Sequence, residues 1–265
     1  MRPADVSDQA SQRAILARIR FVLVETSLSG NIGAVARAMK NMGLSRLALV
    51  RPKAGAQGFA DAEALARASG ADDLLQAATV HENLAEALAG CRLVLGSSAR
   101  LRSLEWPRLD AAAGGERLVA EAVHGDVALV LGRERTGLSN DELALCHFLV
   151  QIPTNPDFSS LNVAAAAQVF AYEVRRHLFS GGDGAGALLG VDDSRPDLAT
   201  ADEMDGFHEH LMRTLIRIGY ADAEQCATLS RRLRRLFHRA RPDRTEVNIL
   251  RGILAKMTPR AGGAD

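Results

Sequence analysis

The sequence has few of the features that mark secreted, membrane-bound or metal-dependent proteins. Its 265 residues include only three cysteines, Cys91, Cys146 and Cys226, which are odd in number and widely spaced. This excludes a dense disulfide framework and a CxxC site, and it favours reduced thiols. No apolar run approaches the roughly 18 residues of a membrane span, and residues 1–20 lack the apolar core of a signal peptide. We therefore expect a cytoplasmic protein with no membrane partner.

The fingerprints of several enzyme classes are missing as well. The chain has no GxGxxG for a dinucleotide, no GxxxxGK(S/T) for a nucleotide phosphate, no GxSxG nucleophile turn and no HExxH for zinc. His208 and His210 flank Glu209, but helix residues two apart point to different sides, so we expect no metal site there. These absences disfavour hydride transfer, nucleotide hydrolysis and zinc chemistry.

A net charge is also missing, because 32 lysines and arginines balance 32 aspartates and glutamates. A net charge of zero usually disfavours a nucleic-acid partner, because phosphate binding depends on basic side chains that neutralise phosphates and release counterions. The balance is uneven along the chain, however. Residues 1–180 hold 19 basic and 19 acidic side chains, residues 181–206 hold one and seven, and residues 207–260 hold 12 and five. A neutral protein therefore carries a basic C-terminal segment.

What is present is an alternation of short Val/Leu/Ile-rich runs with longer Ala-rich stretches through residues 20–180. This pattern is typical of an α/β fold, in which helices cover a parallel sheet. We expect strands at 20–25, 46–50, 79–81, 92–96, 127–131 and 148–152. We expect helices at 32–42, 60–68, 83–89, 118–123 and 161–178.

The last third of the chain differs in pattern. Residues 181–201 combine glycines and acids and predict a flexible acidic linker. Residues 202–265 predict a small basic helical domain, because their apolar residues recur at helical spacing. A third helix is expected at 245–257. The two expected apolar faces before it are Phe207, Leu211, Leu215 and Ile218, and then Leu229, Leu233, Leu236 and Phe237.

Three segments place glycines and polar residues at the carboxyl ends of expected strands, where open α/β sheets bind ligands. In the first, 25–43, Gly30 and Gly33 permit close backbone approach and Asn31 is placed to cap the following helix. Arg37, further along that helix, carries a guanidinium that can grip a phosphate with two parallel hydrogen bonds. On this segment alone, a solvated helix face explains Arg37 equally well.

The other two segments are loops. Residues 127–138 end a strand at Gly132 and crowd three charges, including Glu134, into a turn of a kind that is usually solvated. In residues 152–168, two prolines shape the loop, and Ser159 and Ser160 offer hydroxyls at a helix start. For one of these serines, simple N-capping is the alternative interpretation.

The ordered trio NIGAVARAMKNMG, LVLGRERTGLSNDE and IPTNPDFSSLNVAAAAQVFAYE resembles the signature motifs of the SpoU branch of the SPOUT methyltransferases. That resemblance implies a SPOUT-type parallel sheet with a deep C-terminal trefoil knot, a homodimer, and S-adenosylmethionine-dependent methylation of ribose 2′-hydroxyls in RNA. GSSARLRSLEWP and the tail LRRLFHRARPDRTEVNILRGILA extend it to the members that methylate the ribose of nucleotide 32, cytidine or uridine, in the tRNA anticodon loop. Residues 1–19 lie outside the resemblance, and we interpret them as a disordered leader before a methyltransferase domain at 20–180.

The resemblance also implies roles for particular residues, with no metal. Those expected to line the S-adenosylmethionine pocket are Ser97, Ser98, Ala99, Gly132, Ile152, Ser159, Ser160 and Leu161. Those expected around the reacting ribose are Asn31, Arg37, Glu134, Ser160 and Asn162. Those expected to contact tRNA phosphates are Arg231, Arg232, Arg234, Arg235, Arg239, Arg241 and Arg244.

Several alternatives stay open at this point. Arg37 either activates the hydroxyl or clamps the adjacent phosphate; an arginine pKa above about 12 makes it a poor base. The basic tail also fits a solvated face or a surface that docks on a partner subunit. The target could be ribosomal RNA or another tRNA position, or the chain could be a non-catalytic knotted RNA-binding protein. A small-molecule oxidoreductase would lack its glycine fingerprint.

Overall fold

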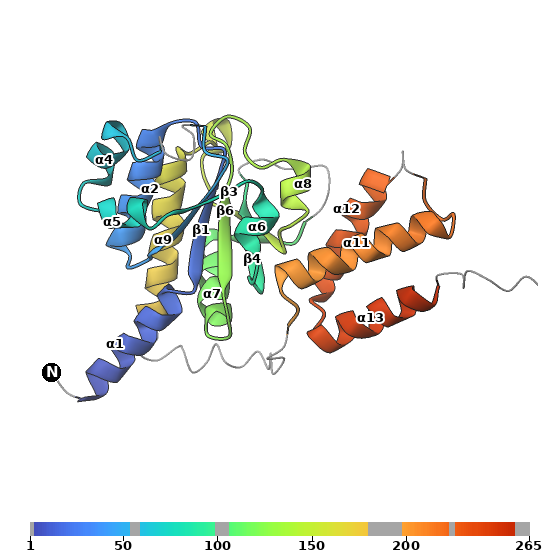
Figure 1. Ribbon diagram of the computed structural model, residues 1–265. Coiled ribbons are helices and arrows are strands. Elements are labelled where there is room, and N and C mark those ends of the chain that lie inside the picture. Colours follow the sequence, from blue (N-terminus) through green and yellow to red (C-terminus); the bar gives the residue numbers. More distant parts are fainter. Residues whose placement is uncertain (1–2, 54–58, 99–105, 180–197, 223–225, 258–265) are drawn as a thin grey trace, which may run out of the picture.

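The computed structural model describes residues 3–53, 59–98, 106–179, 198–222 and 226–257. Within them, seven strands form one parallel sheet in the order β3-β2-β1-β6-β4-β7-β5. Figure 1 shows this sheet between helices on its two sides. The strands are β1 (Ile19–Val24), β2 (Arg46–Val50), β3 (Thr79–His81), β4 (Leu93–Ser97), β5 (Arg108–Asp110), β6 (Val127–Leu131) and β7 (Phe148–Gln151). The predicted α/β class is confirmed, and the six expected strands agree within one residue at each end. The short edge strand β5 is an addition.

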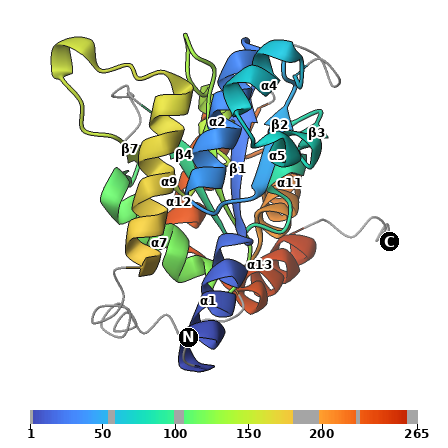
Figure 2. The ribbon, with the colours of Figure 1, turned by 90° about the vertical axis from the view of Figure 1, so that its left-hand side faces the viewer.

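Helices cover both faces of the sheet. On one face, α2, α4, α5, α7 and α9 bury an apolar cluster that includes Phe21 and Leu23 of β1. On the other face, α6 and α8 pack over Val22 and Val24 of the same strand. Figure 2 views the first of these faces. The bounds are α2 (Ser29–Asn41), α4 (Ala62–Ala68), α5 (Asp72–Gln76), α6 (Leu84–Leu88), α7 (Ala111–Ala122), α8 (Asn140–Leu143), the 3₁₀ turn η1 (Pro156–Phe158) and α9 (Val163–Phe179).

Two segments differ from the sequence-based expectation. The segment 1–19, expected to be a disordered leader, contains helix α1 (Pro3–Leu16), whose last residue is buried in the core. Helix α7 begins seven residues earlier than predicted, because Asp110 caps it by accepting a hydrogen bond from the Ala113 N–H at 2.8 Å. Its Gly114 and Gly115, which lower helix propensity, sit where a side chain would strike Val150 and the backbone of α9.

Close helix packing also explains one glycine of the first motif. A Cβ on Gly33 would lie 2.0 Å from the backbone oxygen of Ala64 in α4. The predicted close backbone approach at Gly33 is therefore confirmed, and its neighbour is another helix of the fold. Glycine at this position lets α2 lie directly against α4.

The C-terminal segment forms three helices, α11 (Ala201–Arg217), α12 (Cys226–Ala240) and α13 (Arg244–Lys256). They share a small core of their own around Met204, Phe207, Val247 and Leu254. The helical expectation is confirmed, although Ile218 and Leu236, predicted to share the apolar faces, are 44% and 46% exposed. Ile218 lies just past the end of α11.

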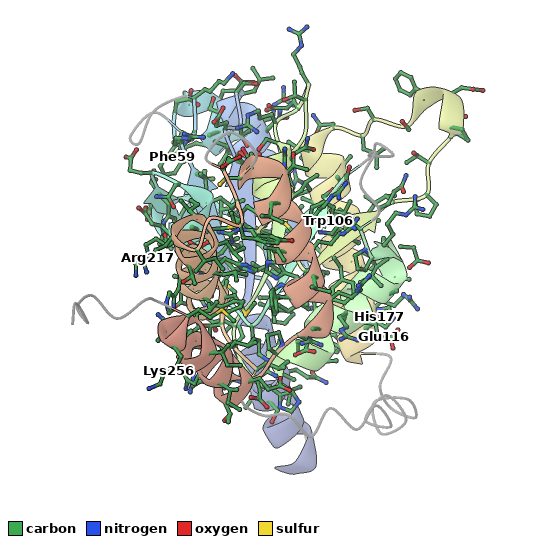
Figure 3. The ribbon with its side chains drawn as sticks, turned by 90° about the vertical axis from the view of Figure 1, so that its right-hand side faces the viewer. Phe59, Trp106, Glu116, His177, Arg217 and Lys256 are labelled. Carbon is green, nitrogen blue, oxygen red and sulfur yellow. The ribbon has the colours of Figure 1, made fainter. Side chains whose placement is uncertain are left out.

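The tail helices pack against the sheet domain on the side of α6 and α8 (Figures 1 and 3). At the centre of this junction, the Glu121 carboxylate of α7 is 6% exposed and accepts hydrogen bonds from Arg92 at 3.1 Å and from Arg241 of the tail at 2.7 Å. The Ala201 N–H donates to the Cys91 carbonyl at 2.8 Å. Of the expected linker 181–201, residues 181–197 lie outside the described ranges, whereas 198–199 are buried in the junction. The junction joins the tail to its own sheet domain through a buried charge cluster.

Candidate functional site

A pocket opens at the carboxyl ends of β4, β6 and β7, the edge where open parallel sheets bind ligands. Loops that follow the three strands supply its walls. Seven of the eight residues expected to bind the cofactor line it, namely Ser97, Ser98, Gly132, Ile152, Ser159, Ser160 and Leu161. Ala99, the eighth, lies outside the described residues. The fold thus brings together side chains from segments more than 60 residues apart.

One wall of the pocket, residues 132–138, is a loop that folds tightly back on itself. A Cβ on Gly132 would lie 2.4 Å from the backbone of Gly137 and of Leu138, so no other residue fits there. The Gly137 N–H donates to the Arg133 carbonyl at 2.9 Å, and Gly137 has a φ of 68°. The loop therefore brings its backbone close to the pocket, and residues 132–137 line it.

A chain of hydrogen bonds connects the three motif segments beside this pocket. The Glu134 carboxylate accepts from the Ser27 N–H at 3.1 Å, from the Ser27 hydroxyl at 3.0 Å and from Asn31 Nδ2 at 3.0 Å. Asn162 Nδ2 donates to Asn31 Oδ1 at 3.0 Å, and Asn162 Oδ1 accepts from the Ala164 N–H at 2.8 Å. Because an ionised carboxylate only accepts, this order also fixes which way each amide faces.

The same contacts set the charge of Glu134. Partial burial pushes its pKa upward, but the hydrogen bonds from Asn31 and Ser27 outweigh burial and hold the pKa below the ordinary glutamate value. Glu134 is therefore a fixed negative charge at neutral pH, with its oxygens already engaged. Such a group anchors and orients its neighbours, and it is a weak proton acceptor.

The capping prediction for Asn31 was wrong, and the alternative capping interpretation of the two serines does not hold either. Asn31 lies within the first turn of α2, whose N-cap is Leu28. The Asn31 side chain donates to Glu134 and, within the described part of the chain, makes no bond to the helix end. At α9, the Asn162 side chain accepts from the first-turn N–H of Ala164, and neither Ser159 nor Ser160 makes such a bond among the described contacts. Asn31 gives up the local role for a contact across the site, whereas Asn162 keeps its local bond and adds one to Asn31, and sequence periodicity reveals neither contact.

Arg37 stands apart from the other expected reaction-site residues. Its side chain is exposed on α2, it does not line the pocket, and no hydrogen bond or ion pair joins it to another described residue. The structure brings Asn31, Glu134 and Asn162 into contact and places Ser160 in the adjoining pocket wall. It leaves the Arg37 guanidinium open to a ligand or to a second protein chain.

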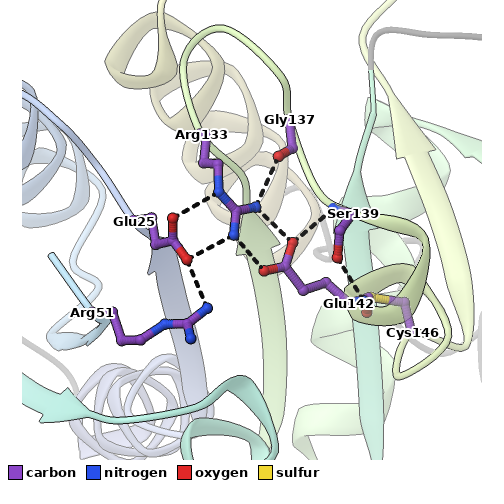
Figure 4. A network of polar contacts seen from close by, with 7 residues as sticks. All are labelled: Glu25, Arg51, Arg133, Gly137, Ser139, Glu142 and Cys146. Carbon is purple, nitrogen blue, oxygen red and sulfur yellow. Dashed lines mark hydrogen bonds and ion pairs between the residues drawn. The ribbon is translucent and has the colours of Figure 1, made fainter. Parts of the chain in front are cut away.

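An ion-pair network that sequence reasoning missed lies behind the 132–138 loop (Figure 4). The Arg133 guanidinium bonds both oxygens of Glu25, at the end of β1, and both oxygens of Glu142 in α8. Arg51 adds a second guanidinium on Glu25 at 2.6 Å. The only signal in the sequence was the cluster of charges after β6, which does not tell which charges pair.

The arginines of the tail divide into paired and exposed groups. Arg234 pairs with Asp205 at 2.5 Å, Arg244 with Glu203 at 2.7 Å, Arg231 lies 3.9 Å from Asp141, and Arg241 holds the junction. Arg235 is half-buried on α12. Arg232 and Arg239 are exposed and have no ion pair with another described residue. The contact of these arginines with tRNA stays a prediction.

Across the described ranges, no three His, Cys, Asp or Glu side chains gather in a group that could hold a metal ion. Among the same residues, no helix has the length and apolar character needed to cross a bilayer.

Comparisons with known proteins match both parts of the chain to RNA methyltransferase families. Residues 18–172 match the SpoU rRNA methylase family, and residues 202–265 match the C-terminal domain of the tRNA methyltransferase TrmJ. The chain is 47% identical over 249 residues to the tRNA (cytidine/uridine-2′-O-)-methyltransferase TrmJ of Klebsiella pneumoniae, covering 94% of this chain and 100% of that protein. It is 49% identical over 256 residues to the tRNA (cytidine/uridine/adenosine-2′-O-)-methyltransferase TrmJ of Pseudomonas aeruginosa, covering 94% and 97%. The crystal structure of TrmJ from Z. mobilis is similar with a TM-score of 0.79 and 33% identity, over 91% of this chain and 99% of that one.

Proposed function

Because the chain belongs to the SpoU methylase family and carries the C-terminal domain of TrmJ, we propose that it methylates the ribose 2′-hydroxyl of nucleotide 32, cytidine or uridine, in the tRNA anticodon loop, with S-adenosylmethionine as donor. The observation that carries this proposal is the pocket. Seven residues matched to the family's cofactor positions converge there, beside the Glu134–Asn31–Asn162 chain of hydrogen bonds. Relatives along nearly the full length are named tRNA 2′-O-methyltransferases.

The chemistry of the pocket suits S-adenosylmethionine. Ser97, Ser98 and Ser160 offer hydroxyls to the polar parts of the donor, and Ile152 and Val163 supply apolar surface to an adenine ring. The fixed charge of Glu134 at the pocket edge complements a sulfonium cation. When bound, the donor supplies a methyl group that moves to the 2′-oxygen as the S–C bond breaks and an O–C bond forms.

The remaining tasks fall on side chains of this protein. The Glu134–Asn31–Asn162 chain fixes the pocket edge at which the ribose has to lie for an in-line approach. Arg37 binds the phosphate beside the target nucleotide and stabilises the alkoxide that develops at the 2′-oxygen. The hydroxyl proton leaves to phosphate or water, because an arginine side chain keeps its own proton at neutral pH. No residue forms a covalent intermediate in this account.

The proposal includes a homodimer, a knot and a cytoplasmic location. A homodimer is supported by the position of Arg37, which does not line the pocket of its own chain and in a dimer would serve the pocket of the second subunit. The knot is supported by the sheet order, since β7 lies between β4 and β5, which follow one another along the chain. The cytoplasm is where the RNA substrate of this reaction is found.

A labelled transfer reaction tests this function. Purified protein is incubated with unmodified tRNA transcript and S-adenosylmethionine that carries a labelled methyl group. We expect label in tRNA and none in a ribosomal RNA fragment of equal length. Binding of S-adenosylmethionine, measured by calorimetry, without any label in RNA would leave a knotted cofactor-binding protein and overturn the proposed reaction.

A further inference from the structure

We propose that Arg133 is a positioning residue for the donor pocket, holding the 132–138 loop in the shape that binds S-adenosylmethionine by pinning it between Glu25 and Glu142. This rests on the proposed function, since it assigns the pocket to that cofactor. The residue does not act on the reacting atoms in this proposal. It acts through the loop backbone.

The geometry of Arg133 is that of a two-sided clamp (Figure 4). Its Nε and Nη2 donate to the two oxygens of Glu25 at 3.0 and 2.8 Å, and Nη1 and Nη2 donate to the two oxygens of Glu142 at 2.9 Å each. Nη1 also reaches the Gly137 carbonyl, at the far end of the same loop, at 3.3 Å. One side chain thus joins both ends of the loop to β1 and to α8.

The loop is short and irregular, and its two ends are the places where Arg133 acts. It contains no helix or named strand, a β-bridge joins Arg133 to Gly137, and Gly137 lies in the left-handed region. The next side chain along, Glu134, leaves on the opposite side toward Ser27 and Asn31. Two neighbouring residues therefore tie the loop to two different parts of the protein, one behind the pocket and one at its edge.

The partners of Arg133 are themselves held in place. The Ser139 N–H donates to Glu142 at 2.7 Å in a capping box at the start of α8, and the Glu142 side chain is 12% exposed. Glu25 directly follows β1 and has a φ of 47°, which fixes the direction of its side chain. Arg133 and Glu25 are 21% and 22% exposed, so solvent screens this network only in part. Removing the guanidinium leaves two carboxylates facing each other across an empty site.

Lysine should not replace Arg133. A single ammonium cannot make parallel pairs of hydrogen bonds to two carboxylates at once, whereas the planar guanidinium fork does so. The requirement is therefore for the shape of the arginine head group as well as for its charge.

The test compares three variants of the full-length protein. Arg133→Met removes the clamp, Arg133→Lys keeps only its charge, and Arg51→Met is the matched control, because Arg51 pairs with the same Glu25 but has no bond to the loop. The affinity for S-adenosylmethionine is measured by calorimetry. The KM values for the donor and for tRNA, and kcat at saturating donor, are measured alongside.

We expect Arg133→Met to weaken donor binding at least 10-fold and Arg133→Lys at least 3-fold, with Arg51→Met within 2-fold of the parent protein. The KM for the donor should rise while the KM for tRNA stays within 2-fold, a split that a general loss of folded protein would not produce. If Arg133→Met fails to fold, Glu142→Gln, which keeps an acceptor oxygen, should still weaken donor binding more than Arg51→Met does. Equal donor affinity in Arg133→Met and Arg51→Met would overturn the inference, while a parent protein that binds no donor would instead overturn the proposed function.

Discussion

At the scale of single residues, the site separates groups that hold shape from groups that meet substrate. Glu134 accepts from Ser27 and Asn31, and its depressed pKa keeps it ionised. It therefore resembles an anchor more than a base. Arg37, by contrast, is exposed and free of ion pairs with other described residues. Among the candidates it is the group best placed to meet an incoming phosphate.

Replacing Arg37 tests that division. We expect Arg37→Ala to lower methyl transfer at least about 100-fold, since one lost donor to a developing oxyanion costs that much in other enzymes. Binding of S-adenosylmethionine should remain within twofold, because Arg37 does not line the pocket. Lys40→Ala is the matched control, one turn further along α2 on an exposed position that pairs with Asp73. Near-normal turnover in Arg37→Ala would show that the assignment is wrong.

At the scale of secondary-structure elements, the sheet was the most predictable part. Buried parallel strands such as β6, VALVL, carry apolar side chains on both faces and stand out in any sequence. Short elements were missed: β5, α5 and α8 have three to five residues, too few for a periodic pattern to repeat. Their positions are set by tertiary contacts, such as the bonds of Arg133 to Glu142.

At the site, too, some features follow from local sequence and others depend on contacts between distant parts of the chain. The motifs predicted which residues gather at the pocket, because each motif follows a strand and parallel strands end at one edge. Which side chains pair across the edge was not predictable. Asn31 was expected to cap its own helix and instead binds Glu134, some 100 residues away in the chain. Partner choice of this kind depends on the sheet order, which local patterns do not contain.

Helix α12 gives a prediction at this scale. Its two exposed arginines, Arg232 and Arg239, are available to RNA phosphates, whereas Arg241 is committed to the junction with Glu121. We expect the double variant Arg232→Glu with Arg239→Glu to weaken tRNA binding at least about tenfold. The slope of log affinity against log salt, which is negative, should become shallower by about 2. Filter binding at several salt concentrations measures both quantities.

The control for this prediction is Arg67→Glu, an exposed charge reversal on α4 of the sheet domain. It changes the net charge without altering the tail. An unchanged salt slope in the α12 variant, or an equal loss in Arg67→Glu, would remove the case for α12 as an RNA-binding element.

At the scale of the whole molecule, the junction between sheet domain and tail contains three buried histidines. The His147 and His238 rings lie 4.6 Å apart between centroids, and His208 lies 5.9 Å from His238. Burial lowers the pKa of His208 to about 2 and of His238 to about 4, with further lowering from Arg234. Burial also holds the pKa of His147 well below its usual value. All three are neutral in the folded protein.

Acid should therefore destabilise the folded protein. Below the ordinary histidine pKa of 6.5, the unfolded chain binds protons that the folded chain does not, so the free energy of unfolding falls as pH falls. The slope approaches about 1.4 kcal/mol per pH unit for each histidine. Denaturant unfolding at pH 7 and pH 5.5 measures this loss. His238→Leu should reduce it by about a third, whereas His124→Asn, at an exposed site, should not. An equal pH slope in all three proteins would contradict this account of the junction.

The charge distribution also acquires a meaning at this scale. The balance of 32 basic and 32 acidic residues includes a neutral sheet domain and a basic tail. Some of the tail's arginines form ion pairs, either with acidic residues of the tail itself or, at Arg241, with Glu121 of the sheet domain. The charge left for RNA is therefore smaller than the sequence count indicates. Exposed basic side chains outside these ion pairs include Arg232 and Arg239 on α12 and Arg251 and Lys256 on α13.

The most direct test of the central claim is to map the methyl group on the product. Unmodified tRNA is treated with the protein and S-adenosylmethionine, digested, and analysed by mass spectrometry for 2′-O-methyl nucleotides. The account predicts a single new 2′-O-methyl group at nucleotide 32, and none when that nucleotide is replaced by its 2′-deoxy form. A methyl group on a base, or on a ribose outside the anticodon loop, would contradict it.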